Sequence, residues 1–243
     1  MLGKEKWEEI IVATPRESLF KGNEYEWQGL LNAGDSNNKQ VIDHVINVLE
    51  RETIKIRRGD KKDTTPKENN AEINYDYKQP ISYSIVTKKD ENGGLYVFVY
   101  ERLKGGTETR LHNQLSIGVG GHMNVLPEDR SFIEVVREEA ERELEEELIF
   151  EGEGANVSEY PVNIVGFIND ESNDVGKVHL GVLHTLGVNW EHQVKVKEVE
   201  QLKGEWMSLE QIEEVKDRLE SWSKIALEAI KSNGKVNVVH NSL

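Results

Sequence analysis

The chain has 243 residues, a formal net charge of −15 and no cysteine. This charge disfavours a broad nucleic-acid-binding surface, and the lack of cysteine excludes disulfides and thiolate chemistry. At this length we expect one large domain with an extension. The start lacks the apolar core of a signal peptide, and no stretch approaches the roughly 20 apolar residues of a membrane span. We therefore expect a cytoplasmic protein.

Residues 1–80 are interpreted as an N-terminal extension. The stretch "NKQVIDHVINVLERE" places apolar residues at helical spacing and predicts a helix from about 38 to 52. Residues 57–80 are polar and charged, which predicts an exposed, weakly ordered connector. The large apolar residues of the extension are too many to be left exposed. We expect them to pack on the following domain or in a homodimer contact; they are Trp7, Ile10, Ile11, Phe20 and Trp27.

Residues 81–243 are interpreted as the main domain. The runs "ISYSIVTKK" and "LYVFVYERL" flank the turn "DENGG" and predict a β-hairpin whose second strand is apolar on both faces. Two more strands are expected in "VNIVGFIND" and "KVHLGVLHTLGV". The segment "GEWMSLEQI" predicts a turn into a late helix, with a capping box formed by Ser208 and Gln211. The mixture predicts an α+β fold.

An acidic helix lies between these strand pairs. Seven of the twelve residues in "REEAERELEEEL" (137–148) are glutamates. Ser131 and Glu134 form a capping-box pattern, so the helix is expected to start at Ser131. An apolar residue every fourth position predicts a buried stripe; its members are Val136, Ala140, Leu144 and Leu148.

The spacing of the glutamates brings three carboxylates to one face of this helix. Glu143, Glu146 and Glu147 lie within about one helical turn of one another. Oxygen ligands at that spacing suit Mg²⁺ or Mn²⁺. The alternative is an ordinary solvated face, because most charge runs are solvated. The preceding "SIGVGGHMN" has Gly120 and Gly121 where the backbone is expected to turn tightly or to approach a ligand closely.

These residues resemble the signature of the Nudix hydrolases: a glycine, a glutamate, then R-E-U-x-E-E-x-G-U, with U an aliphatic residue. The six residues from Arg142 to Glu147 match the R-E-U-x-E-E core, and Glu134 stands at the expected distance before it. Two features depart from the pattern. Twelve residues separate Gly121 from Glu134 where the pattern has five, and the last glycine is replaced by Ile149.

The resemblance covers residues 81–231 and implies a Nudix-like α/β/α sandwich around a mixed β-sheet. It implies a divalent-metal-dependent pyrophosphohydrolase that cleaves the diphosphate linkage of a nucleoside diphosphate joined to another group, X. The cofactor would be Mg²⁺ or Mn²⁺, and the substrate a small nucleotide derivative. The alternative is a catalytically weak Nudix-like nucleotide-binding or regulatory module.

The resemblance also assigns roles to particular residues. Glu143, Glu146 and Glu147 would be metal ligands, and Arg142 would orient them by ion pairing. Substrate contacts are assigned to two arginines and to the glycine backbone: Arg102, Arg110, Gly120 and Gly121.

Several roles stay open at this stage. The general base is not identified, and the candidates are Glu139, Glu198 and Glu200. His122 could line the site or be hydrogen-bonded to the backbone. For three strand aromatics, packing in the core is favoured over stacking on a nucleotide base; these are Tyr96, Phe98 and Tyr100.

Overall fold

The computed structural model describes residues 8–60, 62, 66–103, 114–128 and 130–232. Contacts between Cα atoms group the chain into two compact units, each assembled from three segments. Unit 1 comprises Met1–Ser82, Gly121–Glu139 and Gly166–Val182; unit 2 comprises Tyr83–Gly120, Ala140–Val165 and Leu183–Leu243. Unit 1 thus combines the N-terminal extension with two later segments, and the division at residue 80 stays a prediction.

The described chain forms an α+β fold with a mixed sheet, as predicted. Its helices are α1 (Arg16–Leu19), α2 (Lys39–Arg51), α3 (Phe132–Glu147), α4 (Asp174–Val178), α5 (Leu209–Glu214) and α6 (Ser221–Ser232). Its strands are β1 (Ile10–Pro15), β2 (Gly29–Asn32), β3 (Ile54–Arg57), β4 (Tyr77–Lys89), β5 (Leu95–Arg102), β6 (Leu115–Ser116), β7 (Val119–His122), β8 (Leu148–Glu151), β9 (Val162–Asn169), β10 (His179–Gly187), β11 (Gln193–Val196) and β12 (Leu202–Ser208).

Main-chain hydrogen bonds give the strand order β12-β5-β4-β10-β9-β2, and the paths of β4, β9 and β10 run through both units. A separate pair joins β11 and β8. Within the described residues, no helix is both long and apolar enough to cross a membrane.

In unit 1 the N-terminal extension pairs with later segments of the chain. Strand β1 pairs antiparallel with β3 and with the start of β4. Strand β2 pairs antiparallel with β9, where Leu31 lies opposite Phe167. Helix α2 closely matches the predicted helix and buries Ile42, Val45, Val48 and Leu49. The extension therefore packs on residues beyond 81, as its apolar content predicts; Trp7 lies outside the described residues.

The prediction of an exposed connector is wrong for its second half. Residues 66–69 are exposed, but the next eleven residues contain a 3-10 turn, η4 (Ala71–Ile73), and the start of β4. Four polar side chains of this stretch are buried: Asn70, Asn74, Lys78 and Gln79. Composition misleads here because the buried polar groups have hydrogen-bond partners, such as the Ala71 carbonyl for the Gln79 amide.

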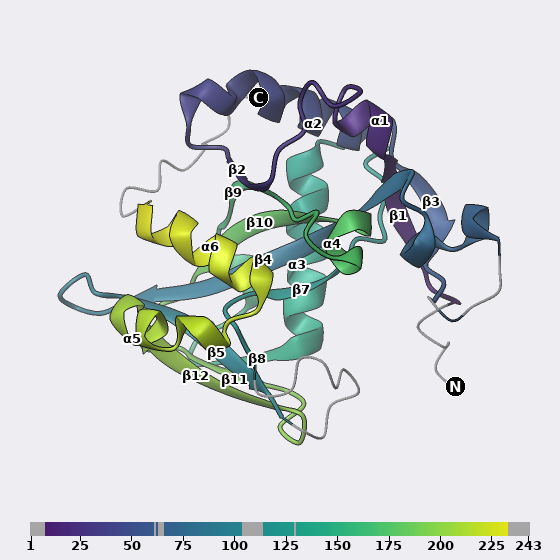
Figure 1. Ribbon diagram of the computed structural model, residues 1–243. Helices are drawn as coiled ribbons and strands as arrows, with labels where there is room; N and C mark the ends of the chain where they lie inside the picture. Colours follow the sequence, from purple (N-terminus) through teal and green to yellow (C-terminus); the bar gives the residue numbers. More distant parts are fainter. Residues whose placement is uncertain (1–7, 61, 63–65, 104–113, 129, 233–243) are drawn as a thin grey trace. The chain divides into compact units, whose positions relative to one another are not determined.

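Unit 2 contains the predicted hairpin. Strands β4 and β5 pair antiparallel with Thr87 opposite Val97, and β5 also pairs with β12 (Figure 1). The centre of β5, from Val97 to Tyr100, is buried, which confirms that both faces of this strand are covered. Helix α5 begins with the predicted capping box of Ser208 and Gln211.

Candidate functional site

Helix α3 begins where its sequence predicts. The Ser131 hydroxyl and backbone N–H donate to Glu134 Oε2 at 2.8 and 2.9 Å, and the Glu134 N–H donates back to Ser131 Oγ at 3.3 Å. The Phe132 N–H donates to Glu50 Oε1 of α2 at 2.7 Å. Two carboxylates thus accept from N–H groups at the positive end of the helix dipole. The predicted apolar stripe is buried along its whole length.

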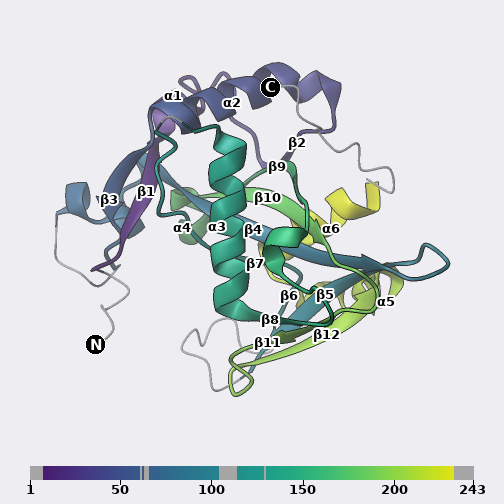
Figure 2. The same cartoon turned by 180° about the vertical axis from the view of Figure 1, so that it is seen from behind.

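The helix ends without the glycine of the signature. Glu147 is followed directly by β8, which lies beside β11 (Figure 2). Ile149, at the glycine position, is a strand residue opposite Lys195. Lys197 satisfies the helix end: its N–H donates to the Glu147 carbonyl at 2.9 Å, and its Nζ donates to the Glu145 carbonyl. These carbonyls are among those that a C-terminal glycine motif otherwise satisfies.

Arg142 joins two of the predicted metal ligands. Its Nη2 lies 2.7 Å from Glu143 Oε1, and its Nη1 lies 3.2 Å from Glu146 Oε1. The Glu143 side chain is 9% exposed and that of Glu146 is 59% exposed. Glu147 is half-buried on the last turn. Arg142 therefore lies where it can orient two of the carboxylates.

The three carboxylates are less closely gathered than the helical spacing predicts. In the described part of the chain, no three carboxylates of α3 have ligand atoms within 4.8 Å of one another. Like charges repel, and Arg142 already pairs with the buried Glu143 and with the exposed Glu146. The structure thus places Glu143, Glu146 and Glu147 on neighbouring positions without closing them into one tight group.

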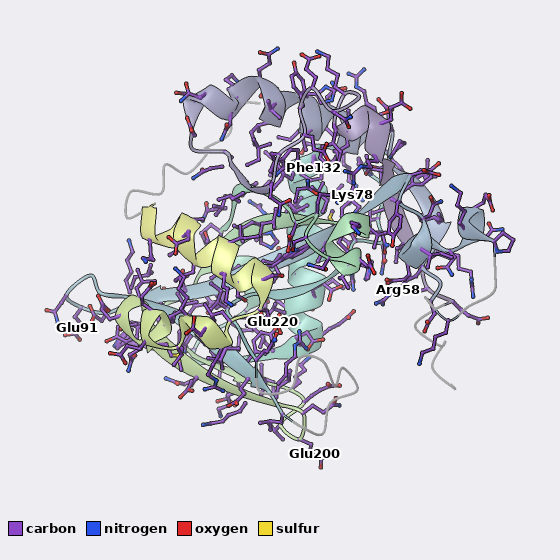
Figure 3. All side chains as sticks on the ribbon, in the orientation of Figure 1. Arg58, Lys78, Glu91, Phe132, Glu200 and Glu220 are labelled. Atoms are coloured by element: carbon purple, nitrogen blue, oxygen red, sulfur yellow. The ribbon has the colours of Figure 1, made fainter. Side chains whose placement is uncertain are left out.

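The candidates for the general base differ in environment. Glu139 is fully buried, and its Oε1 accepts the Val125 N–H at 3.0 Å, so it anchors the long loop before α3. Glu198 and Glu200 are exposed on the turn between β11 and β12, where Glu200 points away from the ribbon (Figure 3). The geometry selects none of the three.

The predicted substrate-binding residues lie in different environments. Gly120 and Gly121 lie within strand β7, so the expected tight turn is not formed there. Arg102 Nε is 2.7 Å from Glu220 Oε1, and its guanidinium lies over the Tyr100 ring at 5.5 Å. Arg110 lies outside the described residues.

The strand aromatics pack in unit 2. Phe98 and Tyr100 are buried, and Phe98 meets Trp206 edge-on with 5.4 Å between ring centroids. The Tyr100 hydroxyl donates to the Gly118 carbonyl at 2.8 Å, and burial raises its pKa to about 12. Tyr96 is half-buried against Trp190. The core-packing interpretation is confirmed for Phe98 and Tyr100.

One group of side chains was missed by the sequence analysis. Glu72, His122 and His179 place ligand atoms within 4.8 Å of one another in unit 1. His122 had been singled out alone, and its ring contacts the side chains of Gln79 and His179. No sequence signal could have found the group, because its members come from three separate segments.

No family model matches the chain. Protein YmaB of Bacillus subtilis (strain 168) is 38% identical to it over 228 residues, which cover 93% of this chain and 99% of YmaB. The chain belongs to the YmaB family. The match extends over nearly the whole length of both proteins.

Solved structures connect this YmaB-family chain to a known fold. Tm1382, described as a candidate Nudix hydrolase, aligns with 92% of this chain and 99% of its own, at a TM-score of 0.62 and 24% identity. A mutT/nudix family protein from Listeria innocua aligns with 63% of this chain and 92% of its own, at a TM-score of 0.43 and 17% identity. The comparison with Tm1382 confirms the predicted Nudix fold.

Proposed function

We propose that this YmaB-family protein is a hydrolase that cleaves the diphosphate linkage of a nucleoside diphosphate joined to another group, X, with a divalent metal as cofactor. The observation that carries the proposal is the arrangement at the end of α3, where Arg142 pairs with Glu143 and Glu146 beside Glu147. This is the R-E-U-x-E-E core, and it lies on a helix of a chain with the Nudix fold.

The residues at the end of α3 suit Mg²⁺ or Mn²⁺. Three carboxylates on neighbouring positions supply the hard oxygen donors that these ions prefer. A bound divalent ion would neutralise diphosphate oxygens and activate water for attack on phosphorus. A protein with a net charge of −15 also needs such cations to hold a polyanionic substrate.

The remaining roles are to orient the metal ligands and to bind the substrate. Arg142 holds Glu143 and Glu146 in place by ion pairing, and Glu147 supplies the third carboxylate. The backbone at Gly120 and Gly121, in strand β7, is proposed to contact the substrate. Arg102 is proposed to bind phosphate, a role in which it would exchange its Glu220 partner for the substrate. Arg110 keeps the same proposed role.

The deciding experiment is a phosphate-release screen with the full-length protein. Dinucleoside polyphosphates, nucleotide sugars and nucleoside triphosphates are each incubated with Mg²⁺, with Mn²⁺ and with a chelator. Turnover of at least one class that requires the metal supports the hydrolase. Saturable binding of a nucleotide without turnover would favour the regulatory module instead. A homodimer remains a prediction, which sedimentation of the same preparation tests.

A further inference from the structure

Unit 1 contains a second group of candidate metal ligands, separate in sequence from the glutamates of α3. Glu72 comes from η4, His122 from the end of β7 and His179 from the start of β10. The Nε2 atoms of the two imidazoles are 3.1 Å apart. Gln79 of β4 adds an oxygen, since its Oε1 lies 2.8 Å from His122 Nε2. His179 and Gln79 are 6% and 0% exposed.

Main-chain carbonyls hold both buried side chains in orientation. His179 Nδ1 lies 2.6 Å from the Val175 carbonyl oxygen, so this nitrogen carries the proton and Nε2 keeps its lone pair towards His122. The Gln79 amide donates to the Ala71 carbonyl at 3.0 Å, which turns its oxygen towards the same histidine.

The group has more acceptors than protons. His122 Nε2 faces both the Gln79 oxygen and the His179 lone pair, and a single N–H there cannot satisfy both well. Glu72 adds a carboxylate, paired with Arg58 at 3.3 Å. Arg58 also pairs with Glu9 at 3.1 Å, so one guanidinium is shared between two carboxylates. Converging acceptors of this kind favour a cation.

We propose that Glu72, His122 and His179 bind a first-row transition-metal ion, Zn²⁺ by their donor set. Two imidazoles and a carboxylate are a recurrent zinc donor set. Nitrogens about 2.0–2.1 Å from a tetrahedral Zn²⁺ lie about 3.3 Å apart, close to the 3.1 Å separation of the two imidazole nitrogens.

A bound ion would tie together η4, β7 and β10 within unit 1. Mg²⁺ prefers oxygen ligands, so it does not compete well for two imidazoles. The inference goes beyond the proposed hydrolase and does not depend on it.

The test is a Co²⁺ titration of chelator-treated full-length protein in millimolar Mg²⁺, followed by visible absorption and by displacement with Zn²⁺. Wild type is expected to bind one equivalent and to show the absorption of tetrahedral Co²⁺. His179→Asn keeps a donor for the Val175 carbonyl while removing Nε2, and Glu72→Gln keeps the shape of a half-buried side chain. Each should weaken binding about 10-fold or more, at least the loss seen for outer-shell changes.

Two controls keep the outcome decisive. His44→Asn removes an imidazole of α2 that hydrogen-bonds the Ser18 carbonyl, and it should leave the spectrum unchanged. Glu147→Gln should abolish the proposed turnover and also leave the spectrum unchanged, which separates the two proposals. Absence of Co²⁺ absorption in wild type, or wild-type binding by Glu72→Gln and His179→Asn, would overturn the site. Should His179→Asn not fold, the wild-type and Glu72→Gln titrations decide.

Discussion

The two groups of candidate metal ligands differ in how the chain assembles them. The group on α3 stands within six consecutive residues, Arg142 to Glu147, and Glu146 is largely exposed. The group in unit 1 draws Glu72, His122 and His179 from positions 50 and 57 residues apart, and His179 is almost fully buried. The α3 group forms as soon as the helix forms, whereas the group in unit 1 forms only when the whole unit has folded.

The difference also changes what each group costs in free energy. Glu146 is largely exposed and keeps much of its hydration, and Arg142 pairs with it and with the buried Glu143. Buried imidazoles and amides must find partners, because an unsatisfied buried polar group costs about 1–3 kcal/mol. The Val175 and Ala71 carbonyls supply such partners for His179 and Gln79. The group in unit 1 is therefore prearranged, whereas the α3 carboxylates would need a bound ion to draw them together.

The largest expected effect comes from breaking the α3 group. Glu147→Gln removes the charge of a proposed metal ligand but leaves the main-chain bond from Lys197 intact. We expect kcat to fall about 100-fold or more, the scale of losing one group that stabilises a transition state. Glu145→Gln, the exposed position between Leu144 and the paired glutamates, is the matched control and should change kcat little. Equal effects of the two substitutions in the phosphate-release assay would mean that the face is merely solvated.

The second prediction concerns pH and the buried strand that carries Gln79. Burial lowers the pKa of Lys78 from 10.5 to about 8, against the opposing effect of its hydrogen bond to Glu171. Between these two values the unfolded chain binds more protons than the folded one, so the contribution of Lys78 to stability rises with pH. The free energies of unfolding of wild type and Lys78→Met are measured in urea at pH 7.5, 8.5 and 9.5. The stability of wild type relative to Lys78→Met should increase as the pH rises. A difference independent of pH would contradict the lowered pKa.

The third prediction tests whether Gln79 contributes to the proposed zinc site. Gln79→Glu replaces the amide that donates to Ala71 with a carboxylate, which should cost about 1–3 kcal/mol in chelator because the Ala71 carbonyl loses its donor. With Zn²⁺ the added charge becomes favourable, so the zinc-induced rise in melting temperature should exceed that of wild type. Gln40→Glu, an exposed change on α2, is the control. A rise equal to that of wild type would place Gln79 outside the coordination sphere.

The smallest effect is expected from restoring the signature glycine. Ile149 is 41% exposed and sits in a strand, where glycine is unfavourable. Ile149→Gly should lower the free energy of unfolding by about 1 kcal/mol and leave turnover unchanged. Ile149→Ala separates the lost side chain from the added backbone freedom. A gain in turnover would show that the missing glycine limits activity.

Local patterns in the sequence predicted the elements that depend on neighbouring residues. The caps at Ser131 and Ser208, the buried stripe of α3 and the hairpin of β4 and β5 all follow from spacing of a few residues. The contiguous R-E-U-x-E-E core was visible for the same reason.

The misses share one physical cause, which is pairing between distant segments. Polar composition predicted exposure for residues 70–80, but Lys78 reaches Glu171, 93 residues away, and is fully buried. The sequence around His122 does not predict its contact with His179, because the two residues meet only after β7 and β10 are in place. Strand β8 was not predicted, because the residue whose side chain completes the helix end, Lys197, lies far downstream.

The closure of α3 by Lys197 bears on the order in which the protein folds. In most helices the carbonyls of the last turn accept hydrogen bonds from nearby residues. Here the Glu145 carbonyl accepts from the side chain of Lys197, 52 residues further on. That bond requires β11 to find β8, a non-local step that closes a long loop. The turn that carries Glu146 and Glu147 is thus expected to stay frayed in the nascent chain until residues 193–197 have emerged and paired. Substitutions of Lys197 should then speed unfolding with little effect on the folding rate, the signature of a contact formed after the transition state.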